Sequence, residues 1–140
     1  MIRSYLHILF IAALALLSCD EKFVIVNCNE CTATEPVDVV LEITLDQQET
    51  SNIHISVYDG NIEDNILLKS FYTNAIETEV RVKVNKKYTL TAEYHESGGS
   101  SCIVVNTAYP RVRYEMNQCE EPCYYVSDKK VKLKLKYKYF

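Results

Sequence analysis

A two-residue alternation of apolar and polar side chains recurs along this chain and constrains its fold more than any other feature. It is cleanest over residues 130–139, where five lysines alternate with valine, leucine and tyrosine. Successive side chains of a β-strand point to opposite faces of the sheet, so the alternation predicts strands with one buried face. Shorter segments repeat the pattern at 37–45, 53–57, 80–84, 88–94 and 112–116. No segment shows an apolar stripe with the 3.6-residue period of a helix, and we expect an all-β fold.

Turn signals separate the alternating segments at intervals typical of antiparallel sheets. They lie at 59–61, 85–87 and 97–100, and Pro110 indicates a bend or bulge. Two apolar runs without clean alternation, 66–72 and 103–105, are interpreted as further strands. Parallel strands would need crossover helices. We therefore predict a single antiparallel seven-stranded sandwich, Ig-like or transthyretin-like, over residues 37–140.

The first 18 residues have the layout of an export signal. Arg3 supplies a positive charge, and residues 8–17 are apolar throughout. A helix needs about 20 apolar residues to cross a bilayer, so this run is too short for a membrane span. A charged start, an apolar middle and a small-residue end are typical of a signal peptide, which we expect at 1–18.

The sequence Leu16-Leu17-Ser18-Cys19 resembles the lipobox of bacterial lipoproteins. The resemblance implies that Cys19 carries a diacylglycerol on its sulfur, that the chain is cut before it, and that the new amino group is acylated. Each buried CH₂ contributes about 0.8 kcal/mol, and several acyl chains together anchor a protein stably. The membrane is then a partner through the lipid, and residues 19–36 form a tether and lead-in.

Two acidic residues, Asp20 and Glu21, directly follow Cys19. In Bacteroidota, acidic residues at this place resemble the signal that sends lipoproteins to the outer face of the outer membrane. In enterobacteria, an aspartate there resembles an inner-membrane retention signal, and a solvated tether would also be charged. We expect a lipid-anchored outer-membrane protein exposed at the surface, with a periplasm-facing location as the alternative.

Residues 55–60 (Ile-Ser-Val-Tyr-Asp-Gly) and 88–94 (Tyr-Thr-Leu-Thr-Ala-Glu-Tyr) resemble small Bacteroidota lipoproteins with a transthyretin-like sandwich. Such domains are also described as prealbumin-like or carboxypeptidase-regulatory-like. The likeness covers roughly residues 37–139 and rests on short motifs. It implies an accessory, adhesive or spacer module rather than a catalyst. The cysteines are not part of this resemblance.

Five cysteines follow Cys19, and outside the inner membrane disulfide formation is their default state. They are Cys28, Cys31, Cys102, Cys119 and Cys123. We expect Cys102 to pair with Cys119 or Cys123, or those two to pair with each other across the turn at 120–122. An odd number leaves at least one thiol free or joined elsewhere. The pairs Cys28-x-x-Cys31 and Cys119-x-x-x-Cys123 superficially resemble a four-thiolate zinc site. Their spacing is not that of a zinc ribbon, and we expect no metal.

Aromatic and arginine side chains in the C-terminal third form a candidate binding patch for sugar or peptide, because these residue types favour contact surfaces. They are Tyr109, Arg111, Arg113, Tyr124 and Tyr125. The lysines of 130–138 either meet an anionic partner or protect an edge strand from aggregation. The loop 59–64 is either a hairpin turn or a calcium-binding loop.

The sequence does not indicate catalysis. His95 with Ser97, Ser100 or Ser101 could be written as a dyad, but nothing in their spacing supports it. A net charge of −4 without a basic block argues against nucleic acid as a partner. We expect no cofactor and a non-catalytic envelope lipoprotein that binds or scaffolds another cell-surface component, an envelope protein or a glycan. The alternatives are a carbohydrate- or peptide-capturing accessory module for nutrient uptake, and a metal-binding or enzymatic protein.

Overall fold

The computed structural model describes residues 25–47, 52–95 and 99–136. Its elements, in chain order, are the 3₁₀ turn η1 (Cys28–Glu30), β1 (Asp38–Thr44), β2 (Ile53–Asp59), the 3₁₀ turn η2 (Ile62–Asp64), β3 (Leu67–Thr73), β4 (Glu77–Lys83), β5 (Tyr88–His95), β6 (Ser101–Ala108), β7 (Arg111–Glu115), β8 (Cys123–Ser127) and β9 (Lys130–Lys132). The expected signal peptide at 1–18 and the lipidation site Cys19 lie outside these ranges. Within them, no helix is long and apolar enough to cross a membrane.

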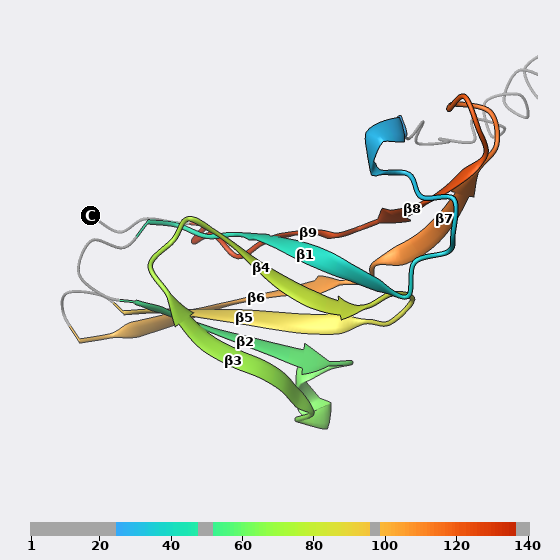
Figure 1. Ribbon diagram of the computed structural model, residues 1–140. Helices are drawn as coiled ribbons and strands as arrows, with labels where there is room; N and C mark the ends of the chain where they lie inside the picture. Colours follow the sequence, from blue (N-terminus) through green and yellow to red (C-terminus); the bar gives the residue numbers. More distant parts are fainter. Residues whose placement is uncertain (1–24, 48–51, 96–98, 137–140) are drawn as a thin grey trace, which may run out of the picture.

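The strands form three sheets (Figure 1). One has the order β4-β1-β9, the second β3-β2-β5-β6, and the third is the hairpin of β7 and β8. All neighbours pair antiparallel except β1 and β9, which run parallel. The all-β prediction is confirmed, but the described residues form nine strands in three sheets where the sequence predicted seven in one sandwich.

The core lies between the two larger sheets, which face each other as two layers (Figure 1). One layer contributes alternate residues of β1, β4 and the β9 segment, and the other contributes alternate residues of β2 and β5. These buried side chains are Leu41, Ile43, Val80, Val82, Val131 and Leu133 on one side, and Ile53, Ile55, Val57, Tyr88, Leu90, Ala92 and Tyr94 on the other. They are apolar positions of the segments 37–45, 53–57, 80–84 and 88–94, and for these segments the faces predicted to be buried are confirmed, apart from the exposed Val37. In the segment 112–116 the prediction was wrong, because Tyr114 and Met116 are exposed.

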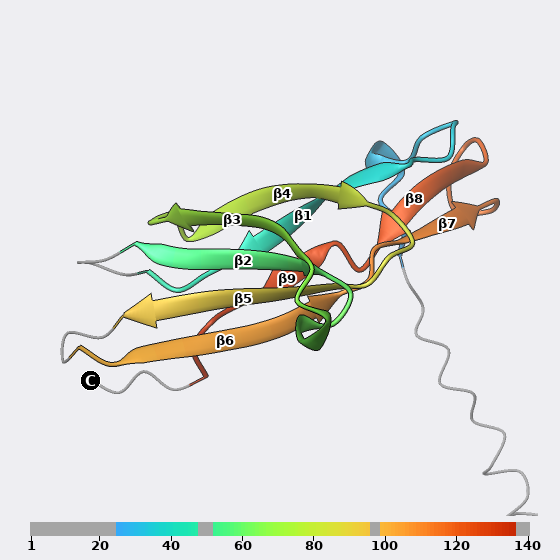
Figure 2. The ribbon, with the colours of Figure 1, turned by 90° about the horizontal axis from the view of Figure 1, so that it is seen from below.

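The strands at the C-terminal end differ most from the prediction. Pro110 follows β6 where the chain leaves the four-stranded sheet, and β7 then pairs with β8, a segment that the alternation did not reveal. Within the described part of the alternating segment, residues 130–136, only 130–132 form a strand, because β1 provides parallel partners for these three residues alone. The hairpin of β7 and β8 projects from one end of the sandwich, beside the N-terminal lead-in (Figures 1 and 2).

Candidate functional sites at the cystine cluster and the outer sheet face

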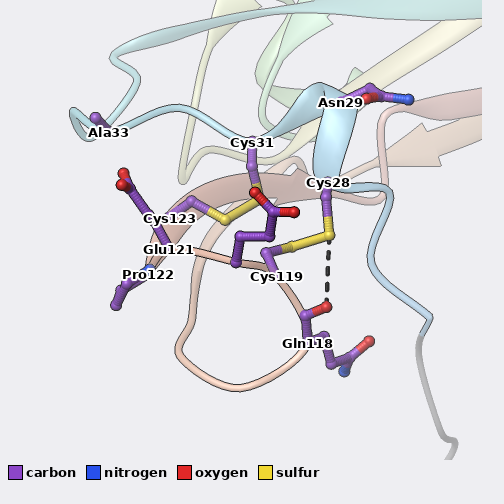
Figure 3. Close-up of a pocket in the computed structure, with 10 residues that line it drawn as sticks. Cys28, Asn29, Cys31, Ala33, Gln118, Cys119, Glu121, Pro122 and Cys123 are labelled. Atoms are coloured by element: carbon purple, nitrogen blue, oxygen red, sulfur yellow. Dashed lines mark hydrogen bonds between the residues drawn. A yellow bond between two sulfur atoms is a disulfide. The ribbon is translucent and has the colours of Figure 1, made fainter.

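Two disulfides join the lead-in to the β7–β8 hairpin (Figure 3). Cys28, in η1, pairs with Cys119 in the hairpin loop, and Cys31, just after η1, pairs with Cys123 at the start of β8. The Cα atoms are 5.7 Å and 5.4 Å apart. We call these four residues the cystine cluster. A surface pocket lies over it and is also lined by Glu120, Glu121 and Pro122.

The predicted pairing of the cysteines was wrong, although four of the five candidates do form bridges. Cys102 is a free, exposed thiol on β6, an edge strand of the four-stranded sheet. Cys119 and Cys123 do not pair with each other, because a two-way backbone bridge between Thr32 and Tyr124 lays the lead-in alongside β8. Both hairpin cysteines then face a cysteine of the lead-in.

Lys129 ties the cystine cluster to the sandwich. Its ammonium group contacts the carboxylate of Glu30 in η1 and lies 3.4 Å from Glu42 of β1. The hydrogen bond to Glu30 raises the pKa of Lys129, and the same bond lowers the pKa of the Glu30 carboxyl. The side chain of Lys129 is 22% exposed but that of Glu30 is 51% exposed, so water screens this ion pair from the Glu30 side.

The hairpin divides the predicted aromatic and arginine patch. Arg113 stands opposite Tyr125 on one face, whereas Tyr124 stands opposite Tyr114 on the other, with ring centroids 4.8 Å apart. Tyr109 precedes the hairpin, and the guanidinium of Arg111 lies over its ring at 4.2 Å from the centroid. The five residues are neighbours in space, but they do not form one continuous surface.

The other sequence-predicted groups lie apart from the cystine cluster. The lysines at 130, 132, 134 and 136 are all exposed, and Lys138 lies outside the described residues. In the 59–64 loop, Lys86 binds Asp59 at 3.0 Å and Lys87 binds Asn61 at 2.6 Å, so ammonium groups already contact oxygens that a calcium ion would need. His95 stands opposite Ser101 in the β5–β6 register, at the exposed end of the sheet.

The solvent side of the four-stranded sheet carries a site that the sequence did not predict. Residues directly opposite one another in an antiparallel sheet share a face, so the register gives two outward rows. The rows are Tyr72–His54–Glu93–Ile103 and Ser70–Ser56–Thr91–Val105, from β3, β2, β5 and β6 in turn. We call these eight residues the outer sheet face, and Figure 2 shows the four strands side by side.

His54 is the hub of this face. Its Nε2 atom lies 2.6 Å from the hydroxyl of Ser70, and its ring stacks on that of Tyr72 with centroids 4.6 Å apart. Its Nδ1 atom lies 3.7 Å from a carboxylate oxygen of Glu93, an ion-pair distance when the ring is protonated. A serine, a histidine and a carboxylate in this order can activate a nucleophile. The side chains of His54 and Glu93 are nevertheless 29% and 32% exposed, so water reaches them.

Sequence reasoning missed the His54 cluster because its members come from three strands. The alternation carried part of the signal, since it placed His54 and Glu93 at polar positions of their segments, but Tyr72 ended a run without clean alternation. The contact between these residues depends on strand order and register. Comparison of the chain with protein-family models, with curated proteins and with solved structures gives no match.

Proposed function

We propose that this chain is a non-catalytic lipoprotein of the bacterial envelope, anchored through Cys19, whose β-domain binds another cell-surface component through the outer sheet face. The export signal and the lipobox-like sequence support the anchor, and the two acids that follow support display at the outer-membrane surface. Release of residues 1–18 leaves the lead-in as the link between the lipid and the disulfide-joined hairpin.

The apolar ends of the outer sheet face carry the binding proposal. Tyr72 at one edge is 66% exposed, and Ile103 and Val105 at the other edge are 59% and 52% exposed. Exposed apolar groups around convergent polar groups mark interaction surfaces. Between these ends lie the imidazole of His54 and the hydroxyl of Ser70, which can exchange hydrogen bonds with a ligand. A ligand that lies across the strands would meet both kinds of contact.

The alternative of a carbohydrate- or peptide-capturing accessory module rests on the same face. A solvent-exposed tyrosine ring near hydroxyl and carboxylate groups offers stacking and hydrogen bonding together. Tyr72 stacks on His54, and His54 in turn contacts Ser70 and Glu93. Ser56 and Thr91, in the middle of this face, are buried, so a ligand of either class would contact mainly the exposed side chains around them. The exposure of His54 and Glu93 weakens the electrostatic interactions that would activate a serine nucleophile, and this favours binding over catalysis.

For the finer fold, we propose the transthyretin-like form of the sandwich rather than the immunoglobulin one. In immunoglobulin constant domains the first, second, fourth and fifth strands share a sheet. Here β1 pairs with β4 and β9, while β2 pairs with β3 and β5 in the opposite layer. The strand order thus departs from the immunoglobulin pattern. The three- and four-stranded sheets supply the two layers, and the β7–β8 hairpin is an addition to them.

Binding is tested by site-specific photo-crosslinking in intact cells, with the crosslinking residue at Val105 of the outer sheet face. A matched control carries it at Glu79, an exposed position of β4 in the opposite layer. We expect a discrete adduct from position 105 and none from position 79. Equal crosslinking from both positions, or none from either, contradicts the proposed face.

Glycan and peptide arrays probed with the detergent-solubilised full chain distinguish the two ligand classes from a protein partner. We expect Tyr72→Ala to weaken retention on any positive feature at least tenfold. Tyr109→Ala serves as the control, because it removes the same ring from the hairpin patch. If Tyr109→Ala abolishes binding and Tyr72→Ala does not, the ligand binds at the hairpin patch and not at the outer sheet face.

A further inference from the structure

We propose that the cystine cluster has a second, reduced state. In that state Cys28, Cys31, Cys119 and Cys123 bind one thiophilic divalent cation, such as Zn²⁺. The sulfur atoms of Cys31, Cys119 and Cys123 all lie within 4.8 Å of one another, and Cys28 is bonded to Cys119. Four sulfurs therefore share one small volume. A tetrahedral zinc–thiolate centre with Zn–S bonds of about 2.3 Å needs sulfurs about 3.8 Å apart, a small rearrangement from these positions.

The long interval between the two pairs is not that of a zinc ribbon, but the spacing within each pair suits such a centre. Structural zinc sites take their cysteines in pairs separated by two to four residues. Here the two pairs are Cys-Asn-Glu-Cys, around η1, and Cys-Glu-Glu-Pro-Cys, before β8. Each disulfide joins one cysteine of the first pair to one of the second, so the two pairs face each other (Figure 3).

Contacts other than the disulfides hold the two segments together. Thr32 and Tyr124 exchange backbone hydrogen bonds of 2.9 Å and 2.8 Å directly after Cys31 and Cys123. On the far side of the cluster, the backbone N–H of Val26 donates to the side-chain oxygen of Gln118 at 3.0 Å. These bonds do not depend on the oxidation state of sulfur. Reduction therefore leaves four thiols close together rather than separating the segments.

The surroundings also suit a thiol state. Cys28 Sγ lies 3.6 Å from the backbone oxygen of Gln118, the contact drawn as a dashed line in Figure 3. A disulfide sulfur has no proton to donate, whereas a thiol at this place can donate to that oxygen. The pocket above the cluster is open to solvent and lined by Glu120 and Glu121, which gives a cation a route to the sulfurs.

Conversion between the two states needs a dithiol reductant, such as the active-site dithiol of an envelope thiol oxidoreductase. Each protein disulfide takes two electrons and two protons from one reductant dithiol and yields two protein thiols, while the reductant becomes a disulfide. Binding of one divalent cation by the four thiols then releases four protons and gives a thiolate centre with a net charge of −2. An oxidising envelope favours the disulfide pair, and a reducing one favours the metal centre.

The test uses the full chain in detergent, reduced anaerobically with a phosphine and titrated with Co²⁺. We expect one Co²⁺ per chain, with the intense ligand-field and sulfur charge-transfer absorption of a tetrahedral thiolate site, and displacement of Co²⁺ by Zn²⁺. Bound Zn²⁺ should protect these four sulfurs from alkylation, as read by peptide mass spectrometry, while Cys102 remains reactive.

Two variants complete the test. Cys31→Ser leaves three ligands and should weaken Zn²⁺ binding more than tenfold, whereas Cys102→Ser removes a thiol outside the cluster and should leave binding unchanged. Failure of the reduced chain to take up Co²⁺ overturns the proposal, whether or not the circular dichroism of its strands is retained. So does uptake that Cys31→Ser does not weaken, or that depends on Cys102. Loss of partner binding at the outer sheet face would leave this result unaffected.

Discussion

Tyr94 joins the two layers of the sandwich through a single hydroxyl group. The ring belongs to β5 and is fully buried, and its hydroxyl donates to the backbone oxygen of Leu133 at 2.6 Å. The hydroxyl oxygen of Tyr94 in turn accepts a hydrogen bond from the backbone N–H of Asp46 at 3.0 Å. The hydroxyl thus makes hydrogen bonds to two backbone groups of the opposite layer, one just after β1 and one directly after β9.

We predict that Tyr94→Phe lowers the free energy of unfolding by about 1–3 kcal/mol, because two buried backbone groups lose their partner while the ring volume is kept. Urea denaturation followed by circular dichroism measures this change. Tyr72→Phe is the matched control: its side chain is mostly exposed, so we expect a change within about 0.5 kcal/mol. Equal effects of the two substitutions would contradict the role assigned to Tyr94.

The same residue makes stability depend on alkaline pH. Burial raises the pKa of Tyr94, so the folded state holds the phenolic proton more tightly than the unfolded chain does. This contribution is fully present below the unfolded pKa of about 10 and is lost as pH rises through the folded pKa. Between pH 9 and 11, wild type should therefore lose stability more steeply than Tyr94→Phe in parallel denaturation curves.

Glu30 gives the opposite dependence at acid pH. The hydrogen bond from Lys129 holds its pKa below the usual value, so its contribution is present above the unfolded pKa of about 4.3 and is lost as pH falls through the folded pKa. Glu30 is exposed and water screens the pair, so we expect Glu30→Gln to cost at most about 1 kcal/mol at pH 7 and less near pH 3. Glu35→Gln removes the same charge from an exposed residue nearby. It should not change the free energy of unfolding at pH 7 or near pH 3.

At the scale of elements, the two disulfides close nearly the same loop, with sequence separations of 91 and 92 residues. Either bridge alone keeps that long loop closed in the unfolded chain. The second bridge then closes only a small ring of about nine residues made by the two cysteine segments. The contributions of the two bridges are therefore not independent.

We predict that removing either bridge by a paired Cys→Ser substitution costs about 2–3 kcal/mol, and that removing both costs about 7 kcal/mol by loop-closure entropy. The double loss should exceed the sum of the single ones. Guanidinium denaturation of the three variants without reductant provides the comparison, with Cys102→Ser as the control. Strictly additive losses would show that the bridges act through local packing instead.

The sequence predicted the strands better than it predicted which strands and which cysteines pair. Alternation identified the buried faces, because the side-chain period of a strand is local, and it marked Leu41, Val57 and Leu90 as core positions. The parallel pairing of β9 with β1 and the cysteine pairing are long-range. The cysteine pairing depends on the lead-in lying beside β8, a contact that Thr32 makes with Tyr124 across most of the chain. The His54 cluster was missed for the same reason.

At the scale of the whole molecule, the proposed lipid anchor has a direct test. We expect Cys19→Ser to release the protein from the membrane fraction, because no other acylated residue would hold it there. Cell fractionation measures the release from the membrane, and mass spectrometry measures the loss of the fatty acid. Ser18→Ala preserves a small residue before the cysteine and serves as the control, which should remain membrane-bound. Retention of Cys19→Ser in the membrane would contradict the lipoprotein proposal.

The bridges between Cys28 and Cys119 and between Cys31 and Cys123 also fix how the molecule responds to mechanical tension. A pull on the chain at residue 25 meets Cys28 before it meets β1, and from there it passes through covalent sulfur into the hairpin loop. The central strand of the three-stranded sheet is thus relieved of part of the pull that would otherwise peel it from its neighbours. With the proposed N-terminal anchor and the proposed partner in place, the domain would in this way stay folded while flow drags the partner.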